Sequence, residues 1–147
     1  MIRTFSAKDK PYLINLINLN TPTYFDAAEE KDFIVYLEKQ IEDYYVIEQD
    51  NVIIGCGGIN YETDKNTAII SWDIIHPDFQ KKGLGKELLV YRINRIKDLN
   101  SYANIIVRTS QFSFQFYEKY GFKLIKCTKD YWAKGIDLYK MSYKLGQ

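Results

Sequence analysis

The chain is poor in the residues that build metal centres, disulfide frameworks and membrane spans. Among its 147 residues are 2 cysteines and 1 histidine. Cys56 and Cys127 lack the spacing of a zinc knuckle or a redox pair, so we expect no metal site and two reduced thiols in a cytoplasmic protein. No apolar run approaches the length of a spanning helix, and charged residues come too early for a signal peptide or a membrane anchor.

An excess of either charge is also missing. The chain has 20 basic and 19 acidic residues, whereas proteins that bind nucleic acids or anionic membranes usually carry a large basic excess. We therefore expect neither partner. With 46% hydrophobic and 27% charged residues, and no low-complexity linker, the sequence predicts one globular domain over residues 1–147.

Hydrophobic periodicity predicts the order strand, two helices, three strands, helix, strand, helix and two strands. Asp26 is positioned to cap the second helix, and Gly121 to end the last one. We expect helices near 7–20, 26–41, 84–99 and 112–121, and strands at 2–5, 44–49, 52–61, 67–75 and 104–109. A final hairpin, 122–128 and 136–145, is predicted to turn over 129–135.

The stretch HPDFQKKGLGKELL, residues 76–89, places two glycines among lysines where a helix is predicted to begin. Gly83 and Gly85 permit turns that other residues resist and let an anion approach without meeting a Cβ atom. The unpaired amides and the dipole at a helix N-terminus favour an anion, and neighbouring lysines strengthen the field. The stretch therefore predicts a phosphate-binding turn.

Three phosphate-binding designs compete for this turn. A P-loop requires Ser or Thr after Gly-Lys, but Glu87 follows Lys86, and the earlier glycine is missing. A dinucleotide fingerprint requires a third glycine where Leu88 stands, within a parallel strand-helix-strand unit rather than a meander. The third design is the Q/R-x-x-G-x-G/A turn of the GNAT superfamily of N-acetyltransferases, which QKKGLG at 80–85 matches at each position.

Two further segments resemble the same family. WDIIHPDF is similar to its fourth strand and the following turn, and TSQFSFQFYEKYGF is similar to its Ser-Gln and Phe-Tyr-Glu-Lys-x-Gly-Phe segment. The resemblance covers the whole chain in length and element order. It implies an α/β (α+β) fold with a twisted, mixed but mostly antiparallel sheet of six to seven strands and about four helices.

The resemblance also implies acetyl-CoA as cofactor. Its diphosphate would lie on the turn formed by Lys81, Lys82, Gly83, Leu84, Gly85 and Lys86. Its pantetheine arm would pair with the end of the fourth strand at Asp73, Ile74 and Ile75, and Gln111 matches a further polar contact. Tyr117 matches the tyrosine that donates a proton to the departing thiolate, a role suited to a phenol beside developing negative charge.

An amine attacks only as the neutral base, so a group must take its proton. Asp73 is the first candidate, because a carboxylate is uncommon on a central strand unless it has a specific role. That role can equally be that of a hydrogen-bond partner. Glu62 ranks lower, and His76 matches a position that is usually structural in the family. Neither cysteine matches a nucleophile, so we expect direct transfer without an acyl-enzyme.

The acceptor site is bounded in this family by the loop between the first two helices, the loop before the fourth strand, and the last hairpin. These segments hold the aromatic and acidic candidates Tyr24, Phe25, Glu62, Tyr131 and Trp132, together with Glu29. The expected acceptor is a primary amine of a small molecule or a peptide, and a homodimer is compatible with the exposed hairpin. The alternatives are a non-catalytic acyl-CoA-binding module and, less favoured, a nucleotide-binding protein.

Overall fold

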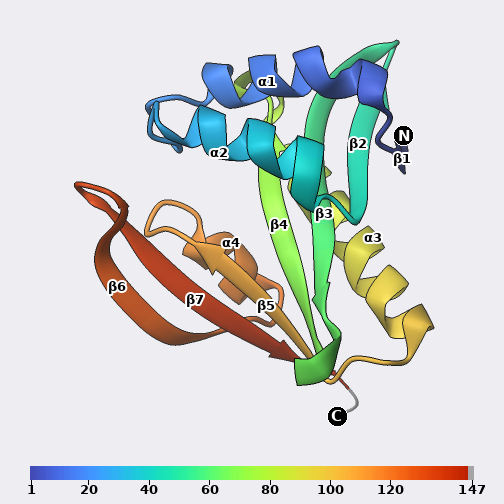
Figure 1. Cartoon of the computed structure of the whole chain (residues 1–147), viewed down its shortest axis with the longest axis vertical. Coiled ribbons are helices and arrows are strands. Elements are labelled where there is room, and N and C mark those ends of the chain that lie inside the picture. Colours follow the sequence, from blue (N-terminus) through green and yellow to red (C-terminus); the bar gives the residue numbers. More distant parts are fainter. Residues whose placement is uncertain (146–147) are drawn as a thin grey trace.

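The computed structural model describes residues 1–145, which form one sheet with helices on both faces (Figure 1). The strands are β1 (Ile2–Thr4), β2 (Asp43–Gln49), β3 (Val52–Glu62), β4 (Thr67–Ile75), β5 (Asn104–Thr109), β6 (Lys123–Ala133) and β7 (Ile136–Lys144). The helices are α1 (Lys10–Leu19), α2 (Glu29–Val35), α3 (Leu84–Leu99) and α4 (Phe114–Lys119), and a π-helical turn, η2 (Tyr36–Gln40), continues α2.

The sheet has the order β1-β2-β3-β4-β5-β7-β6, and every neighbouring pair is antiparallel except β4 and β5. Within residues 1–145 this gives seven strands and four α-helices, which confirms the expected α/β fold. None of the helices described over these residues combines the length and the apolarity needed to cross a lipid bilayer.

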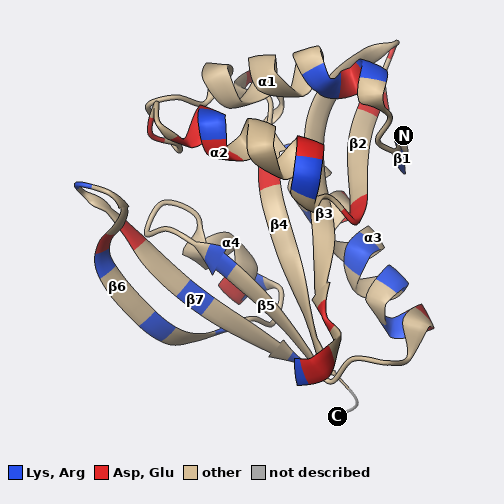
Figure 2. Cartoon of the chain, in the orientation of Figure 1, with Lys and Arg blue, Asp and Glu red and all other residues tan. Residues whose placement is uncertain are grey.

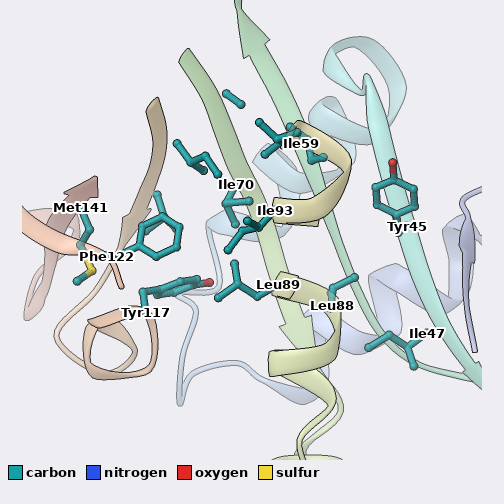
Figure 3. Packing of buried hydrophobic residues seen from close by; sticks show 14 of the residues in the cluster. Tyr45, Ile47, Ile59, Ile70, Leu88, Leu89, Ile93, Tyr117, Phe122 and Met141 are labelled. Atoms are coloured by element: carbon teal, nitrogen blue, oxygen red, sulfur yellow. The ribbon is translucent and has the colours of Figure 1, made fainter. Parts of the chain in front are cut away.

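Alternation of side chains along the strands creates two hydrophobic cores. Tyr44 and Val46 of β2 join the cluster under α1 and α2, whereas Tyr45 and Ile47 join the cluster under α3 and α4. Figure 3 shows the second cluster, in which apolar side chains of α3 pack beside Tyr117 of α4. The helices are thus fixed to both faces of the sheet, and any site between the central strands has rigid walls.

The central strands β4 and β5 pair over only part of their length. Thr67–Ile70 lies beside Asn104–Val107, and the two strands then separate (Figure 1). Trp72 has φ of +50°, and the β3–β4 register shifts beside it, so β4 is bulged where the separation begins. The hydroxyl of buried Tyr44 donates a hydrogen bond to the Trp72 carbonyl (2.8 Å), which holds the bulge in place.

The second helix begins at Glu29, with Ala28 at the N-cap position, so the predicted start and cap at Asp26 are wrong. Asp26 Oδ2 accepts a hydrogen bond from the Ala28 amide (3.0 Å), and Glu29 Oε2 accepts one from the Asp26 amide (2.8 Å), so these two side chains hold the turn that precedes the helix. The regular α-helix is shorter than the predicted 26–41, because its last turn is π-helical over Tyr36–Gln40.

The last helix, α4, ends as predicted at Gly121, whose φ is +103°. The Phe122 amide closes the end by donating to the Tyr117 carbonyl (3.1 Å). The predicted start is wrong, because α4 begins at Phe114, and Phe112 lies before the helix with 51% of its surface exposed.

The predicted extent of the last turn, 129–135, is also wrong. β6 continues to Ala133, and the turn consists of Lys134 and Gly135. Asp130 has φ of +54° and the β6–β7 register shifts around it, so the strand passes through a bulge that resembles a turn in the sequence. Asp130 Oδ1 accepts a hydrogen bond from the Gly135 amide (2.7 Å) and thereby links the bulge to the turn.

Candidate functional site

A cleft of about 860 Å³ lies where β4 and β5 separate. Its walls come from the α1–α2 segment, β4, the turn before α3, β5, α4 and the β6–β7 hairpin, and its size suits a cofactor or another small molecule. The predicted site residues that line it are Tyr24, Phe25, Asp73, Ile74, Ile75, Lys81, Gly83, Gly85, Lys86, Tyr117 and Trp132. Those that do not are Glu62, Lys82, Leu84, Gln111 and Tyr131.

The glycine turn leads into the first turn of α3. Gly83 has φ of +85°, a conformation that costs other residues energy, and no heavy atom lies within 4 Å of the point where a Cβ would stand. Gly85 packs against the Phe116 ring, which lies 3.3 Å from its Cβ position. The N-terminus of α3 therefore faces open space with Lys81 and Lys86 in the cleft wall, which is the arrangement that binds an anion.

Two amide side chains attach this turn to the rest of the fold. Gln80 Nε2 donates to the Ile75 carbonyl (3.1 Å) and to Asn20 Oδ1 (3.0 Å). Asn20 Nδ2 donates to the same Ile75 carbonyl (3.1 Å) and to Leu16 (2.9 Å), so the end of α1, the end of β4 and the turn are joined. Sequence reasoning missed Asn20, whose signal is an amide residue directly after the last apolar position of a helix.

Some residues of β4 direct their main-chain polar groups toward the cleft, and others direct them toward β3. The Ile74 carbonyl lies 3.4 Å from the Cβ position of Gly55, so the main chain of Ile74 faces β3. The Ile75 carbonyl faces the other way and already accepts two side-chain hydrogen bonds. Because orientation alternates along a strand, the main chain of Asp73 also faces the cleft, and it lacks such side-chain cover in the described residues.

The side chain of Asp73 belongs to a buried polar network with Arg92 and Tyr117. Arg92 is fully buried and binds the carboxylate through both terminal nitrogens, with Nη2 2.9 Å from Oδ2. The Tyr117 hydroxyl donates to the same Oδ2 (2.6 Å). Gly57 makes room for the network, since a Cβ there would stand 2.5 Å from Asp73 Oδ1. The glycine at position 57 of β3 thus permits a close approach of these side chains.

This network sets the protonation state of the phenol. Burial and then the negative charge of Asp73 raise the pKa of Tyr117 well above its ordinary value, so its hydroxyl stays protonated at neutral pH. Both oxygens of Asp73 accept hydrogen bonds, Oδ1 from Arg92 and Oδ2 from Arg92 and Tyr117. Sequence reasoning missed Arg92, although it is a charged residue at an apolar position of a helical stripe.

The wall formed by the α1–α2 segment is aromatic. Trp72, turned toward α2 by the bulge, stacks on Phe25 with ring centroids 6.2 Å apart and contacts Phe33 at 5.0 Å. Tyr24 and Glu29 line the same wall. On the opposite side Trp132 is held by a hydrogen bond from its Nε1 to the Thr109 carbonyl (3.0 Å). This end of the cleft is suited to an organic group that stacks on aromatic rings.

The remaining candidates lie outside the cleft lining and have other contacts. Gln111 bridges to the last hairpin, with Nε2 donating to the Gly135 carbonyl (2.6 Å) and Oε1 accepting from the Asp137 amide (2.9 Å). Glu62 lies at the far end of β3, 3.6 Å from Lys65. Lys82 lies over the Phe79 ring, and Leu84 packs against the hydrophobic cluster under α3 and α4. Tyr131 is 49% exposed, and His76 Nδ1 accepts a hydrogen bond from the Asp78 amide (3.1 Å).

The cysteines also lie outside the cleft lining. Cys56 is fully buried, and burial raises the pKa of its thiol to about 12, so it carries no nucleophilic thiolate at neutral pH. Cys127 lies exposed on β6.

Comparison with known proteins gives matches over most of the chain. A family model described as an acetyltransferase (GNAT) domain matches residues 19–145. The amino-acid acetyltransferase of Mannheimia succiniciproducens is 28% identical over 123 residues, which are 84% of this chain and 27% of that protein. That of Vibrio vulnificus is 33% identical over 86 residues, 58% of this chain and 19% of that protein. The chain thus spans about a quarter of the length of these curated relatives.

Solved structures share the fold at low sequence identity. Ribosomal-protein-alanine N-acetyltransferase from Brucella melitensis superposes with a TM-score of 0.76 at 16% identity, covering 99% of each chain. N-acetylglutamate synthase from Neisseria gonorrhoeae, solved with coenzyme A and N-acetyl-glutamate, gives a TM-score of 0.77 at 18% identity and covers 100% of this chain and 35% of that one.

Proposed function

Because the chain belongs to the GNAT acetyltransferase family, we propose that it transfers the acetyl group of acetyl-CoA directly to a primary amine, with both substrates bound together. The observation that carries this proposal is the position of the open helix terminus. The turn at 81–86 and the hydroxyl of Tyr117 belong to one cleft, so a ligand held at the turn extends toward a buried proton donor.

The residues present suit coenzyme A. The open main chain at Gly83 and the first amides of α3 would hold the diphosphate, with Lys81 and Lys86 adding charge. The main chain of Asp73 would pair with the amides of the pantetheine arm in the manner of an added strand. When bound, acetyl-CoA supplies an activated acetyl thioester. Gln111 and Lys82 contribute less in this proposal, since their side chains have contacts outside the cleft.

Tyr117 and Asp73 are the residues that we assign to the chemistry. Tyr117 would turn its hydroxyl proton away from Asp73 and donate it, as a hydrogen bond or completely, to the sulfur that leaves. Asp73 would act as a positioning residue, because it holds the phenol oxygen while Arg92 balances its charge. A small-molecule or peptide amine would bind on the side of the cleft that is formed by the aromatic wall. The matched amino-acid acetyltransferase and ribosomal-protein-alanine N-acetyltransferase support both acceptor classes.

The direct test of this proposal is release of the CoA thiol. We expect the protein, mixed with acetyl-CoA, to release thiol in the presence of at least one of four acceptors: spermidine, L-lysine, L-glutamate and a peptide beginning with alanine. The measurement is the absorbance of a thiol reagent, with mass spectrometry of the acetylated amine. Tight CoA binding without thiol release from any of them would instead support the non-catalytic acyl-CoA-binding module.

The glycine turn makes a separate prediction about binding. Gly83→Asp is expected to weaken CoA binding at least about tenfold, because its carboxylate would face the diphosphate at a position that is now open. The measurement is calorimetric titration with CoA. Gly135→Asp is the matched control, since Gly135 also has positive φ (+83°) and an open Cβ position but lies in the last hairpin. Equal losses in both variants would contradict a diphosphate site at Gly83.

A further inference from the structure

Two carboxylates line the cleft in the described part of the chain, and they differ in their partners. Asp73 is neutralised by Arg92 from the α3 side of the sheet. Glu29, at the start of α2, is 8% exposed, and no ion pair joins it to a cation within residues 1–145. A buried carboxylate without a cation is costly, so its retention in a cleft wall requires an explanation.

The surroundings of Glu29 leave one of its oxygens for a ligand. Oε2 accepts the hydrogen bond from the Asp26 amide, which fixes the side chain at the helix start, whereas Oε1 has no protein hydrogen bond among the described residues. Trp72 and Phe25 line the same wall as a stacked pair. A carboxylate oxygen beside aromatic faces is a combination that binds an ammonium group, through charge pairing and cation–π contact.

The carboxylates of Glu29 and Asp73 also approach the cleft from opposite faces of the sheet. α2 and α3 cover opposite faces of the sheet, so Glu29 reaches the cleft from one face while the Asp73 side chain is held from the other (Figure 1). The proton donor Tyr117 is on the Asp73 side. This separation would keep a group that accepts a proton apart from one that donates a proton.

We propose that Glu29 receives the ammonium group of the acceptor and takes its proton, so that the acceptor is an amine that reaches the cleft as a cation. This inference rests on the proposed acetyl transfer and names the base that transfer needs. The ammonium nitrogen first gives one proton to Glu29 and becomes a nucleophile. The C–N bond then forms as the C–S bond breaks. Tyr117 gives a proton to the sulfur and takes one from the nitrogen, and Glu29 finally releases its proton to water.

The charged neighbours of Glu29 favour this role. Figure 2 shows acidic positions gathered at the start of α2, and Asp26 and Asp32 lie in the same segment. Burial first, and then these two charges, raise the pKa of Glu29 above its ordinary value, which brings it closer to neutral pH. The other titratable or charged groups of the cleft wall are Tyr24, Asp73 with Arg92, Lys81, Lys86, Arg108, Tyr117, Lys119 and Tyr120.

The test is Glu29→Gln, which keeps an oxygen for the Asp26 amide and therefore the helix start. At pH 7 we expect kcat/KM for whichever of the four acceptors the wild type uses to fall by about 10²-fold, with the Kd of acetyl-CoA unchanged. The loss should shrink as the pH approaches the pKa of the amine, because free amine needs no base. O-methylhydroxylamine, which is uncharged at neutral pH, should react equally well with both proteins.

Two controls separate this role from a structural one. Lys31→Gln removes an exposed charge from the same helix and should leave kcat/KM within about twofold. Glu29→Asp keeps the charge and should retain the wild-type acidic limb of the pH profile at lower activity. An active wild type with Glu29→Gln within threefold of it from pH 6 to pH 9 would overturn the inference alone. A wild type that binds acetyl-CoA but acetylates none of the amines would overturn the proposed function, and the inference with it.

Discussion

Tyr117→Phe is expected to lower kcat for CoA release by about 10³-fold, with little change in the affinity for acetyl-CoA. The substitution removes the hydroxyl proton, which Asp73 now orients at 2.6 Å, and leaves the ring in its packing site against Phe116 and Phe122. Since burial and Asp73 raise the pKa of Tyr117 well above its ordinary value, the hydroxyl remains protonated in the wild type between pH 6 and pH 9. The wild-type rate should therefore show no ionisation of Tyr117 in that range.

The control for this experiment is Tyr91→Phe, which removes an exposed hydroxyl from the outer side of α3. It should leave both kcat and cofactor affinity at wild-type values. Thermal melting would show whether Tyr117→Phe stays folded, and we expect a loss of about 1 kcal/mol from the missing hydrogen bond. Wild-type turnover by Tyr117→Phe would remove the phenol from the mechanism.

Arg92→Met is expected to destabilise the protein by about 3 kcal/mol, the largest loss of stability that we predict. Arg92 is fully buried, and its removal would leave the Asp73 carboxylate, 19% exposed, without its positive partner. The Gly58 and Leu88 carbonyls would also lose the hydrogen bonds that Arg92 donates at 3.1 Å. The measurement is the free energy of unfolding from urea titration.

Arg95→Met, on the same helix, is the matched control. Its side chain is 47% exposed and its Nε lies 3.8 Å from Asp43 Oδ2, so its removal should cost less than about 1 kcal/mol. Adding Asp73→Asn to Arg92→Met should recover part of the lost stability, because the uncompensated charge disappears. Similar small losses from Arg92→Met and Arg95→Met would contradict a buried ion pair at Asp73.

Elements with strong local signals were predicted from the sequence. The helix over Leu84–Leu99 has a glycine turn before it and a regular apolar stripe, and both bounds were confirmed. The β2–β3 turn was confirmed at Asp50 and Asn51, whose φ values of +53° and +64° suit these residue types. The last hairpin was misjudged because a bulge and a turn use the same polar residues, and only pairing between β6 and β7 distinguishes them.

The candidate site was predictable where one segment holds several of its residues. The turn at 81–86 and Tyr117 belong to short segments whose order and spacing resemble a family, and the structure places them in one cleft. The Asp73–Arg92 contact joins a strand to a helix nineteen positions further along, so no local pattern specifies it. The orientation of Glu29 depends on a hydrogen bond from the Asp26 amide, and the position of Trp72 beside Phe25 depends on the bulge in β4. Neither can be derived from composition.

Asn20 has a mechanical consequence for the whole molecule. Its side chain holds Gln80 and the end of β4, and its carbonyl accepts the amides of Tyr24 (2.9 Å) and Phe25 (3.3 Å), which begin the aromatic wall. One residue is therefore the common anchor of the segment that would hold the diphosphate and the loop that would meet the amine. Binding of a ligand to either segment restrains Asn20. Binding of the cofactor is therefore expected to change the affinity for the amine, and the reverse, without direct contact between the two ligands.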